Sequence, residues 1–376
     1  MAKSKAAQLW AHFDTMEDPR DQGRNFQHSL QNIIVMTIVA YAAGMKSLEA
    51  CAHFARMQEK WFGQYLSLPN GVPSHDVFRK VMGSIDVEAF QRGFVNWTRG
   101  LQDETEGDVV AIDGKTVRRS GTATQKAVHL VSAWSKLNGI VLGQISTDEK
   151  SNEITAIPKL IESLALEGCI VTIDAMGCQT DIAQAIVDKG AHYLLAVKDN
   201  QKALHDELKV HFDAPEQAPQ FRTAETADKG HGRIEIRRVW VSDDVDTLVE
   251  AERWPCIASV IRVDSERTLK DQTTHETRYY ISSLAKPSPE QALDVVRSHW
   301  EVENKLHWCL DVTMNEDGAC LRDRQLAENG STIRRLAMNS LRRHPGYNGN
   351  LAKASRSVAF DPDFREILIS SIISNA

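Results

Sequence analysis

The chain has 376 residues, of which 42% are hydrophobic and 25% are charged, and its formal net charge at pH 7 is −7. This composition excludes a disordered chain and predicts a globular protein of two or three structural units. The net charge argues against a protein that coats nucleic acid without selectivity, but it is compatible with a local basic face. The cysteines occur singly, the first ten residues lack a secretory hydrophobic core, and the apolar run 33–43 is too short to cross a bilayer. We therefore expect a cytoplasmic protein with no membrane segment.

The first hundred residues have the periodicity of helices. Gly44 is a suitable stop for the first helix, and Ser74 and Asp86 can cap later ones. Helices are expected over residues 30–43, 47–62, 75–85 and 87–99. Residues 1–105 are therefore predicted to form an all-helical N-terminal domain. Residues 76–82 could be the reading helix of a helix-turn-helix, although a packing helix is the commoner role.

Strand-type sequence begins after Gly107. Three successive strands are expected, then a helix, a strand, a helix and a fifth strand, over residues 108–118, 127–134, 139–146, 154–166, 169–173, 181–189 and 192–197. The pair Asn138–Gly139 is a strong hairpin signal between the second and third strands. This order predicts an α/β fold with a mixed sheet covered by helices, as in RNase H-like folds. A doubly wound nucleotide-binding fold would alternate strands and helices from its start.

Residues 211–286 are predicted to form a β-rich insertion, with short strand-like runs over 233–241, 257–263 and 278–282. A long helix is expected to begin at Ser288 or Pro289 and to run through Trp308. The RNase H-like core would then comprise residues 106–210 and 287–345, followed by a C-terminal tail, 346–376. Residues 321–357 carry eight basic and two acidic residues, a bias equally compatible with a solvated helix face and with a DNA-facing surface.

Three acidic residues flank segments that such a sheet would bring together. Asp113 ends the first strand in VVAIDGKT, Asp174 ends the fourth in IVTIDAMG, and Glu303 lies on the long helix. Taken singly, each has an ordinary explanation in turn or surface chemistry. Together they favour a site for Mg²⁺, which prefers oxygen ligands, and two such ions about 4 Å apart can assist phosphodiester chemistry.

Two other motifs fit the first strand poorly. Gly114-Lys115-Thr116 resembles the end of a phosphate-binding P-loop, but Val109 stands where that motif needs its first glycine. An aspartyl-phosphate phosphatase would need a second aspartate two residues from Asp113, and neither Ala111 nor Lys115 supplies it.

At these residues the sequence resembles the H-repeat-associated type of bacterial insertion-sequence transposase, a branch of the DDE transposases. The resemblance covers nearly the whole chain. Its motifs are DPRDQGRNFQHSL (18–30), GVPSHDVFRKV (71–81), AIDGKTVRRS (111–120), IDAMGCQ (173–179), LLAVKDNQ (194–201), GHGRIEIRR (230–238) and HWEVENKLHWCLDVTMNED (299–317).

The resemblance implies that Asp113, Asp174 and Glu303 are the catalytic triad and the ligands of Mg²⁺ or Mn²⁺, with two ions expected. Glu303 rather than Glu301 fits the family pattern His-Trp-x-hydrophobic-Glu-Asn. The implied activity is cleavage and strand transfer on double-stranded DNA, at terminal inverted repeats and a target, by a homodimer. A nuclease of the same fold that does not join DNA, and a catalytically silent DNA-binding descendant, are the alternatives.

Related transposases place Tyr, Arg and Lys at fixed positions around the glutamate, and this chain departs from that pattern. The equivalent positions hold Val296, His299 and Leu310. The departure implies that His299, together with Arg297 and Lys305, makes the phosphate contacts instead.

Other basic residues are expected to contact phosphates, which fix the position of DNA without reading its sequence. Lys115, Arg118 and Arg119 follow the first aspartate, and Lys198 follows the fifth strand beside Asn200. Arg233 and Arg237, with His231 and Arg238 nearby, could form a DNA-facing ribbon, because alternation puts 233 and 237 on one face of a strand. For Trp240 and Trp254, core packing is the expected role.

Overall fold

One mixed sheet of nine strands runs through the part of the chain that the computed structural model describes, residues 11–13, 16–20, 27–147, 152–213, 221–230, 232–270 and 272–373. The strand order is β3-β2-β1-β4-β5-β9-β8-β7-β6. The strands are β1 (Val109–Thr116), β2 (His129–Ser135), β3 (Ile140–Ser146), β4 (Ile170–Ile173), β5 (His192–Val197), β6 (Arg222–Gly230), β7 (Arg233–Ser242), β8 (Ser259–Leu269) and β9 (Gln272–Ser282). β4 pairs in parallel with β1 and β5, and the other neighbours are antiparallel, so the predicted mixed sheet is confirmed.

The helices are α2 (Leu30–Ala42), α3 (Leu48–Met57), α4 (Glu59–Phe62), α5 (His75–Met82), α6 (Val87–Arg99), α7 (Glu153–Ser163), α8 (Thr180–Asp188), α9 (Lys202–His211), α10 (Pro289–His299), α11 (Arg324–Arg342), α12 (Leu351–Phe360) and α13 (Pro362–Ile373). Asp86 caps α6 by accepting from the Ala89 N–H at 2.7 Å, as predicted. The single helix predicted over 47–62 is instead two helices, because the backbone of Gln58 leaves the helical region between α3 and α4. None of the helices in the described ranges combines the length and apolarity of a membrane span.

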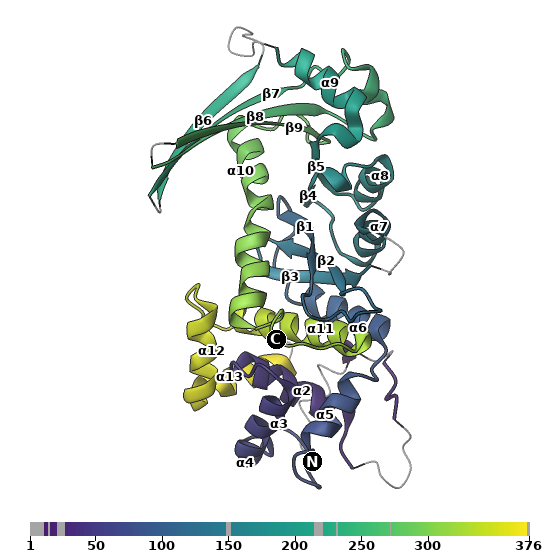
Figure 1. Cartoon of the computed structure of the whole chain (residues 1–376), viewed down its shortest axis with the longest axis vertical. Coiled ribbons are helices and arrows are strands. Elements are labelled where there is room, and N and C mark those ends of the chain that lie inside the picture. Colours follow the sequence, from purple (N-terminus) through teal and green to yellow (C-terminus); the bar gives the residue numbers. More distant parts are fainter. Residues whose placement is uncertain are drawn as a thin grey trace.

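Helices cover both faces of the sheet, with α7 and α8 on one face and α10 on the other (Figure 1). The alternation of β1 explains this arrangement. Val110 and Ile112 pack into the core beneath α7, whereas Val109 packs with the apolar face of α10. Odd-numbered positions of β1 therefore face α10, and this parity decides where Asp113 points.

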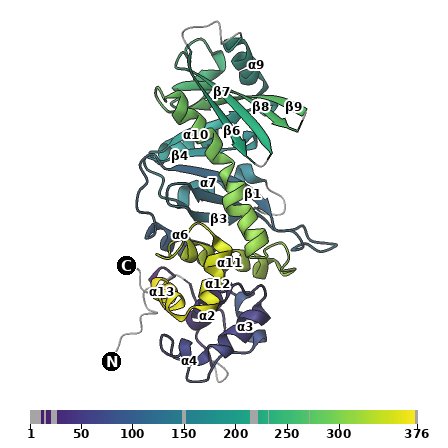
Figure 2. The same cartoon turned by 90° about the vertical axis from the view of Figure 1, so that its left-hand side faces the viewer.

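The helical domain and the C-terminal helices gather at one end of the molecule (Figure 2). The helix α11 packs against both α2 and β3, which joins this end to the sheet. The centre of the basic segment 321–357 is neither a solvated helix face nor a DNA-facing surface, because Arg334 and Arg335 are buried in the core. The guanidinium of Arg334 stacks on the Tyr41 ring at 4.8 Å, and Arg335 pairs with Glu316 at 2.8 Å. These charges serve packing rather than solvent or DNA.

The β-rich segment continues the main sheet, since β9 pairs with β5 from Leu194↔Ser282 to Val197↔Tyr279. Beyond that register, β6 to β9 extend past the core as a curved ribbon (Figure 1). The sequence did not predict β6 or α9. The run RTAETADKG of β6 is largely exposed and lacks a clear apolar alternation. Trp240 and Trp254 are buried in the core, as expected.

Candidate active site

Asp113 and Asp174 lie at neighbouring strand ends on one face of the sheet. The parallel register of β1 and β4 pairs Ile112 with Ile173, so the two aspartates are the next residues along. Both isoleucines pack beneath α7. Because side chains alternate along a strand, both carboxylates face the opposite side, which α10 covers.

A tight turn fixes the carboxylate of Asp174. Its Oδ1 accepts from the N–H groups of Met176 at 3.0 Å and Gly177 at 3.3 Å, which caps the short turn Ala175–Gly177. A Cβ at Gly177 would lie 2.2 Å from Ile173 Cγ2, so the turn requires a residue without a side chain. The amide of Asn200 donates to the Ala175 carbonyl at 2.6 Å and ties this turn to the segment after β5.

The helix that carries Glu303 is longer and less regular than predicted. Ser288 caps α10 by accepting from the Gln291 N–H at 3.1 Å. After α10 the chain continues as π-helical segments, Val302–His307 and Cys309–Thr313. Segments of this kind occur frequently at functional sites. Glu303 is exposed there, next to the buried Val302.

Negative charge gathers around Asp113. Burial, together with the charges of Glu153, Asp174 and Glu303, raises the pKa of Asp113 to about 7, against the opposing hydrogen bond from Gly114 N–H. Asp174 and Glu303 therefore lie near enough to Asp113 for their charges to act on it. The His307 Nδ1 lies 3.7 Å from Asp113 Oδ2, and burial followed by the charge of Arg335 lowers the pKa of His307 to about 4.

The donor set suits a hard divalent cation, because it consists of carboxylate oxygens. Within the described ranges, however, no three or more His, Cys, Asp or Glu side chains converge closely enough to hold an ion. The carboxylates, as they lie in the described part of the chain, are therefore not arranged to share the two expected ions. Repulsion between like charges opposes a closer approach, and a bound cation would offset that repulsion.

A fourth carboxylate, which the sequence did not single out, lies beside this group. Glu153 begins α7, and its Oε1 is 2.6 Å from His129 Nε2. The other ring nitrogen of His129 is 2.9 Å from the Thr116 hydroxyl. A Cβ at Gly114 would lie 2.0 Å from Glu153 Oε1, so this approach requires glycine next to Asp113. An acidic residue in the first turn of a helix is an ordinary capping feature, which is why the sequence alone gave Glu153 no distinction.

Lys115 does not have the surroundings expected of a phosphate ligand. Its side chain is 8% exposed, and its Nζ lies 2.8 Å from Asp311, 3.0 Å from Asp317 and 3.4 Å from Glu316. The ammonium donates a hydrogen bond to Asp317 and lies within ion-pair distance of the other two carboxylates, so its charge is already matched by the protein. Because Lys115 lies two positions after Asp113 on β1, its side chain points to the same face of the sheet.

A groove of about 750 Å³ lies between the β-ribbon and the Glu303 helix. It brings together three predicted basic residues, Arg233, Arg237 and Arg297, with Glu303. It also contains residues that the sequence did not indicate: Arg267, Arg278, His275, Trp300 and Asn304. Five arginines thus face three glutamates. Continuous alternation along β8 and β9 could have revealed Arg267 and Arg278, had those strands been predicted at full length.

Ion pairs order the groove. Arg237 lies 2.8 Å from Glu235, and Arg297 lies 3.0 Å from Asp228. The guanidinium of Arg278 stacks on the exposed Trp300 ring at 4.7 Å. The groove therefore offers cations that are held in place by neighbouring carboxylates.

The other predicted basic residues lie apart from this groove. Arg118 and Arg119 are exposed after β1, and Arg118 Nε lies 3.6 Å from Asp317; Lys198 is exposed after β5. Lys305 lines a different groove beside the exposed Trp308. His231 lies outside the described residues.

His299 turns toward the sheet. Its pKa is lowered by burial, while the nearby charge of Asp174 and a hydrogen bond with the Thr172 backbone oppose that shift. The other expected departures, Val296 and Leu310, are buried apolar residues, so neither can replace a phosphate contact.

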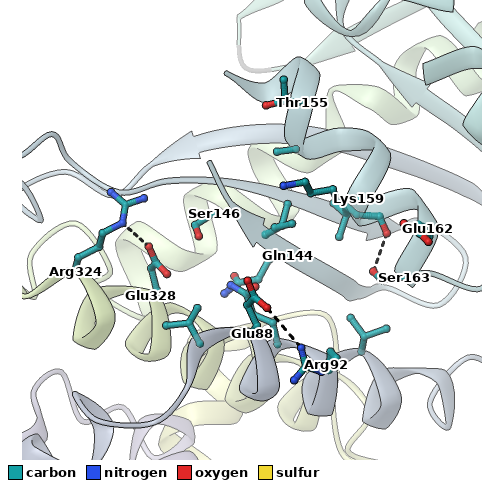
Figure 3. A pocket seen from close by; sticks show the side chains of 16 residues that line it. Glu88, Arg92, Gln144, Ser146, Thr155, Lys159, Glu162, Ser163, Arg324 and Glu328 are labelled. Carbon is teal, nitrogen blue, oxygen red and sulfur yellow. Dashed lines mark hydrogen bonds and ion pairs between the residues drawn. The ribbon is translucent and has the colours of Figure 1, made fainter. Parts of the chain in front are cut away.

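A separate cavity of about 600 Å³ lies between α6, β3, α7 and α11 (Figure 3). None of the predicted site residues lines it. Four of its charged side chains form ion pairs within the cavity, Arg324 with Glu328 at 2.9 Å and Arg92 with Glu88 at 3.7 Å. The groove beside Glu303 is therefore the better candidate for the functional surface.

Comparison with known proteins identifies two matching families. The family described as "DDE_Tnp_1-associated" matches residues 10–98, and the family described as "Transposase DDE domain" matches residues 104–340. The chain is 38% identical over 364 residues to the H repeat-associated putative transposase YhhI of Escherichia coli K12, covering 95% of this chain and 96% of that protein. It is 37% identical over 373 residues to the putative transposase YncI of Escherichia coli O157:H7, covering 96% and 94%.

Among solved structures, a piggyBac transposase synaptic complex with hairpin DNA matches with a TM-score of 0.41 and 10% identity. The match covers 98% of this chain and 77% of that chain. A likeness at this level carries no argument about the site.

Proposed function

The chain belongs to the DDE transposase family, and from this premise we propose that it cleaves DNA at the ends of an insertion sequence and joins them to target DNA. The observation that carries the proposal is the meeting of two strand-end aspartates with the helix of Glu303. We assign the part of the sheet ordered β3-β2-β1-β4-β5 to an RNase H-like core, since three antiparallel strands are followed by two parallel ones.

Asp113, Asp174 and Glu303 are proposed to hold Mg²⁺ or Mn²⁺, with two ions expected. When bound, the ions activate an attacking oxygen and stabilise the leaving oxygen of the phosphodiester. The chain contributes the positions of the ligands. The capping turn orients Asp174, and the sheet register sets Asp113 beside it.

Double-stranded DNA is the proposed substrate, and the arginine-lined groove beside Glu303 is its proposed path. Arg233, Arg237 and Arg297 would neutralise phosphates there, since such contacts position a duplex without reading its sequence. Arg118, Arg119, Lys198, Lys305 and His299 stay proposed phosphate contacts, whereas Lys115 is surrounded by carboxylates and is not proposed as one. A homodimer is proposed because two element ends must be held together.

The test uses the purified chain, Mg²⁺ and a substrate carrying both element ends. We expect cleavage and strand transfer by the natural chain, and loss of both for Asp113→Ala, Asp174→Ala and Glu303→Ala. Glu301→Ala is the matched control, because Glu301 lies on the same helix but lines the groove that holds Lys305 rather than the arginine-lined one. Circular dichroism verifies that each variant is folded.

Three results would contradict the proposal. Cleavage without joining would identify a nuclease, and binding without cleavage a silent descendant. Full activity of Glu303→Ala, with loss in Glu301→Ala, would show that the wrong glutamate has been assigned.

A further inference from the structure

A buried lysine joins the strand of Asp113 to the helix of Glu303. Lys115 lies two residues beyond Asp113 on the same face of β1, and its closest carboxylate partner is Asp311, at 2.8 Å. Asp311 belongs to the second π-helical segment, eight residues beyond Glu303. The ion pair therefore connects the two elements that must stay together for the three carboxylates to meet.

The spacing along both elements matches. Glu303, His307 and Asp311 recur at every fourth position of the helix, while Asp113 and Lys115 are two apart on the strand. Successive members of this helical series meet successive inward-facing residues of β1. His307 can therefore face Asp113, at 3.7 Å, while Asp311 faces Lys115.

The far side of this contact is anchored independently. Glu316, which also lies 3.4 Å from Lys115, is fully buried and pairs with Arg335 of α11 at 2.8 Å. Asp317 accepts both from Lys115 Nζ at 3.0 Å and from the backbone N–H of Arg118 at 2.9 Å. Two of the carboxylates around Lys115 are thus held in place by other contacts, Glu316 by the core and Asp317 by the backbone after β1.

A helical segment with π-type hydrogen bonding needs such support. Isolated π-helix is rare, because its bonding pattern is less favourable than that of the α-helix. The register of residues 302–313 on β1 must therefore come from tertiary contacts. A shift by one residue would rotate Glu303 away from the aspartates and would break the pair between Lys115 and Asp311.

We propose that Lys115 is a positioning residue whose pair with Asp311 sets the register of the π-helical segment and so holds Glu303 over Asp113 and Asp174. The role of those three carboxylates rests on the proposed function. The register itself rests on the contacts alone, so the two ideas can fail separately.

The experiment compares Lys115→Met, Lys115→Arg and Lys136→Met in the full-length protein without DNA. Lys136 is the matched control: it lies in the turn after β2 and pairs with Asp294 of α10 at 2.7 Å, upstream of Glu303. Two quantities are measured, the hydrogen exchange of residues 302–313 and the dissociation constant for Mn²⁺.

For Lys115→Met we expect faster exchange over 302–313 and a loss of Mn²⁺ affinity of about 10- to 100-fold, as when a group that orients a metal ligand is removed. Lys115→Arg should restore most of both properties, since it keeps the positive charge. Lys136→Met should match the natural chain in both measurements.

The proposal is overturned if Lys115→Met keeps the natural exchange and Mn²⁺ affinity, or if Lys136→Met changes them equally. A uniform loss of protection across the chain, without rescue by arginine, would also overturn it and would identify a general stabilising role. If Lys115→Met does not fold, Asp311→Asn makes the same test while leaving the lysine two carboxylates. Should the natural chain bind no Mn²⁺, the proposed function fails, while exchange over 302–313 still decides the register.

Discussion

The surroundings of Asp113 destabilise the ionised form of its carboxyl group. Burial, and then the charges of Glu153, Asp174 and Glu303, raise its pKa from 3.8 to about 7. The Asp113 carboxyl therefore holds its proton more tightly in the folded chain than in the unfolded chain. The stability that comes from this protonation is fully present below about pH 4 and is lost as the pH rises through about 7.

Asp113→Asn should therefore stabilise the metal-free protein at pH 8, because it removes the opposed charge. The gain should be roughly 1–3 kcal/mol after allowance for solvent screening, and it should disappear near pH 4. Urea unfolding in EDTA at the two pH values measures it. Asp246→Asn, at an exposed loop position, is the control and should change little. A variant less stable than the natural chain at pH 8 would refute this account of the site.

The sequence could single out three candidate carboxylates, whose catalytic role stays a prediction, but it could not predict the surroundings of Lys115. A strand that ends in aspartate is visible in the local sequence, and the family motifs support it. The burial of Lys115 depends instead on Asp317, 202 residues away, and on Asp311 and Glu316 near it. Local sequence cannot distinguish a lysine that faces a phosphate from one that faces a distant acidic turn.

Among the elements, α6 has a glycine in its middle, Gly93, which allows the helix to pack closely against Phe13. A Cβ at Gly93 would lie 2.1 Å from Cδ1 of Phe13, a buried ring of the helical domain. In an exposed helix, alanine would be favoured over glycine by about 1 kcal/mol. Here the overlap should outweigh that preference, since overpacking a core costs about 1–3 kcal/mol.

Gly93→Ala should therefore lower the free energy of unfolding, which chemical denaturation measures. Adding Phe13→Ala removes the ring and makes room, so the double variant should be more stable than additivity of the two single changes predicts. Strict additivity would mean that the ring moves aside and that the close packing has no energetic weight.

Local sequence predicted those elements whose own residues face a core. α2 and β5 carry near-continuous apolar runs, α6 follows a capping residue and α7 is amphipathic, and all four were found within three residues of their predicted bounds. β6 was missed because backbone pairing with β7 holds this largely exposed strand, rather than burial of its own side chains. The helix of Glu303 was predicted to end at Trp308 but continues to Thr313, because tertiary contacts such as Lys115–Asp311 support a π-helical continuation.

For the whole molecule, the distribution of charge matters more than its total. The net charge is −7, yet five arginines line the groove beside Glu303. The Debye length is about 8 Å at physiological salt, so a phosphate in the groove interacts with the nearby arginines far more than with distant acidic residues. The net negative charge is therefore compatible with the proposed path of DNA through this groove.

Removing one groove arginine should weaken duplex binding by a similar factor on all sequences, because phosphate contacts do not read bases. For Arg267→Ala and Arg297→Ala, the slope of log K against log salt should each fall by about one. Fluorescence anisotropy with a labelled duplex, titrated over a range of salt, gives the slope. Arg253→Ala is the control, since Arg253 pairs with Glu250 on an exposed turn and does not line the groove. An unchanged slope in both groove variants, or an equal fall in the control, would mean that DNA binds elsewhere on the molecule.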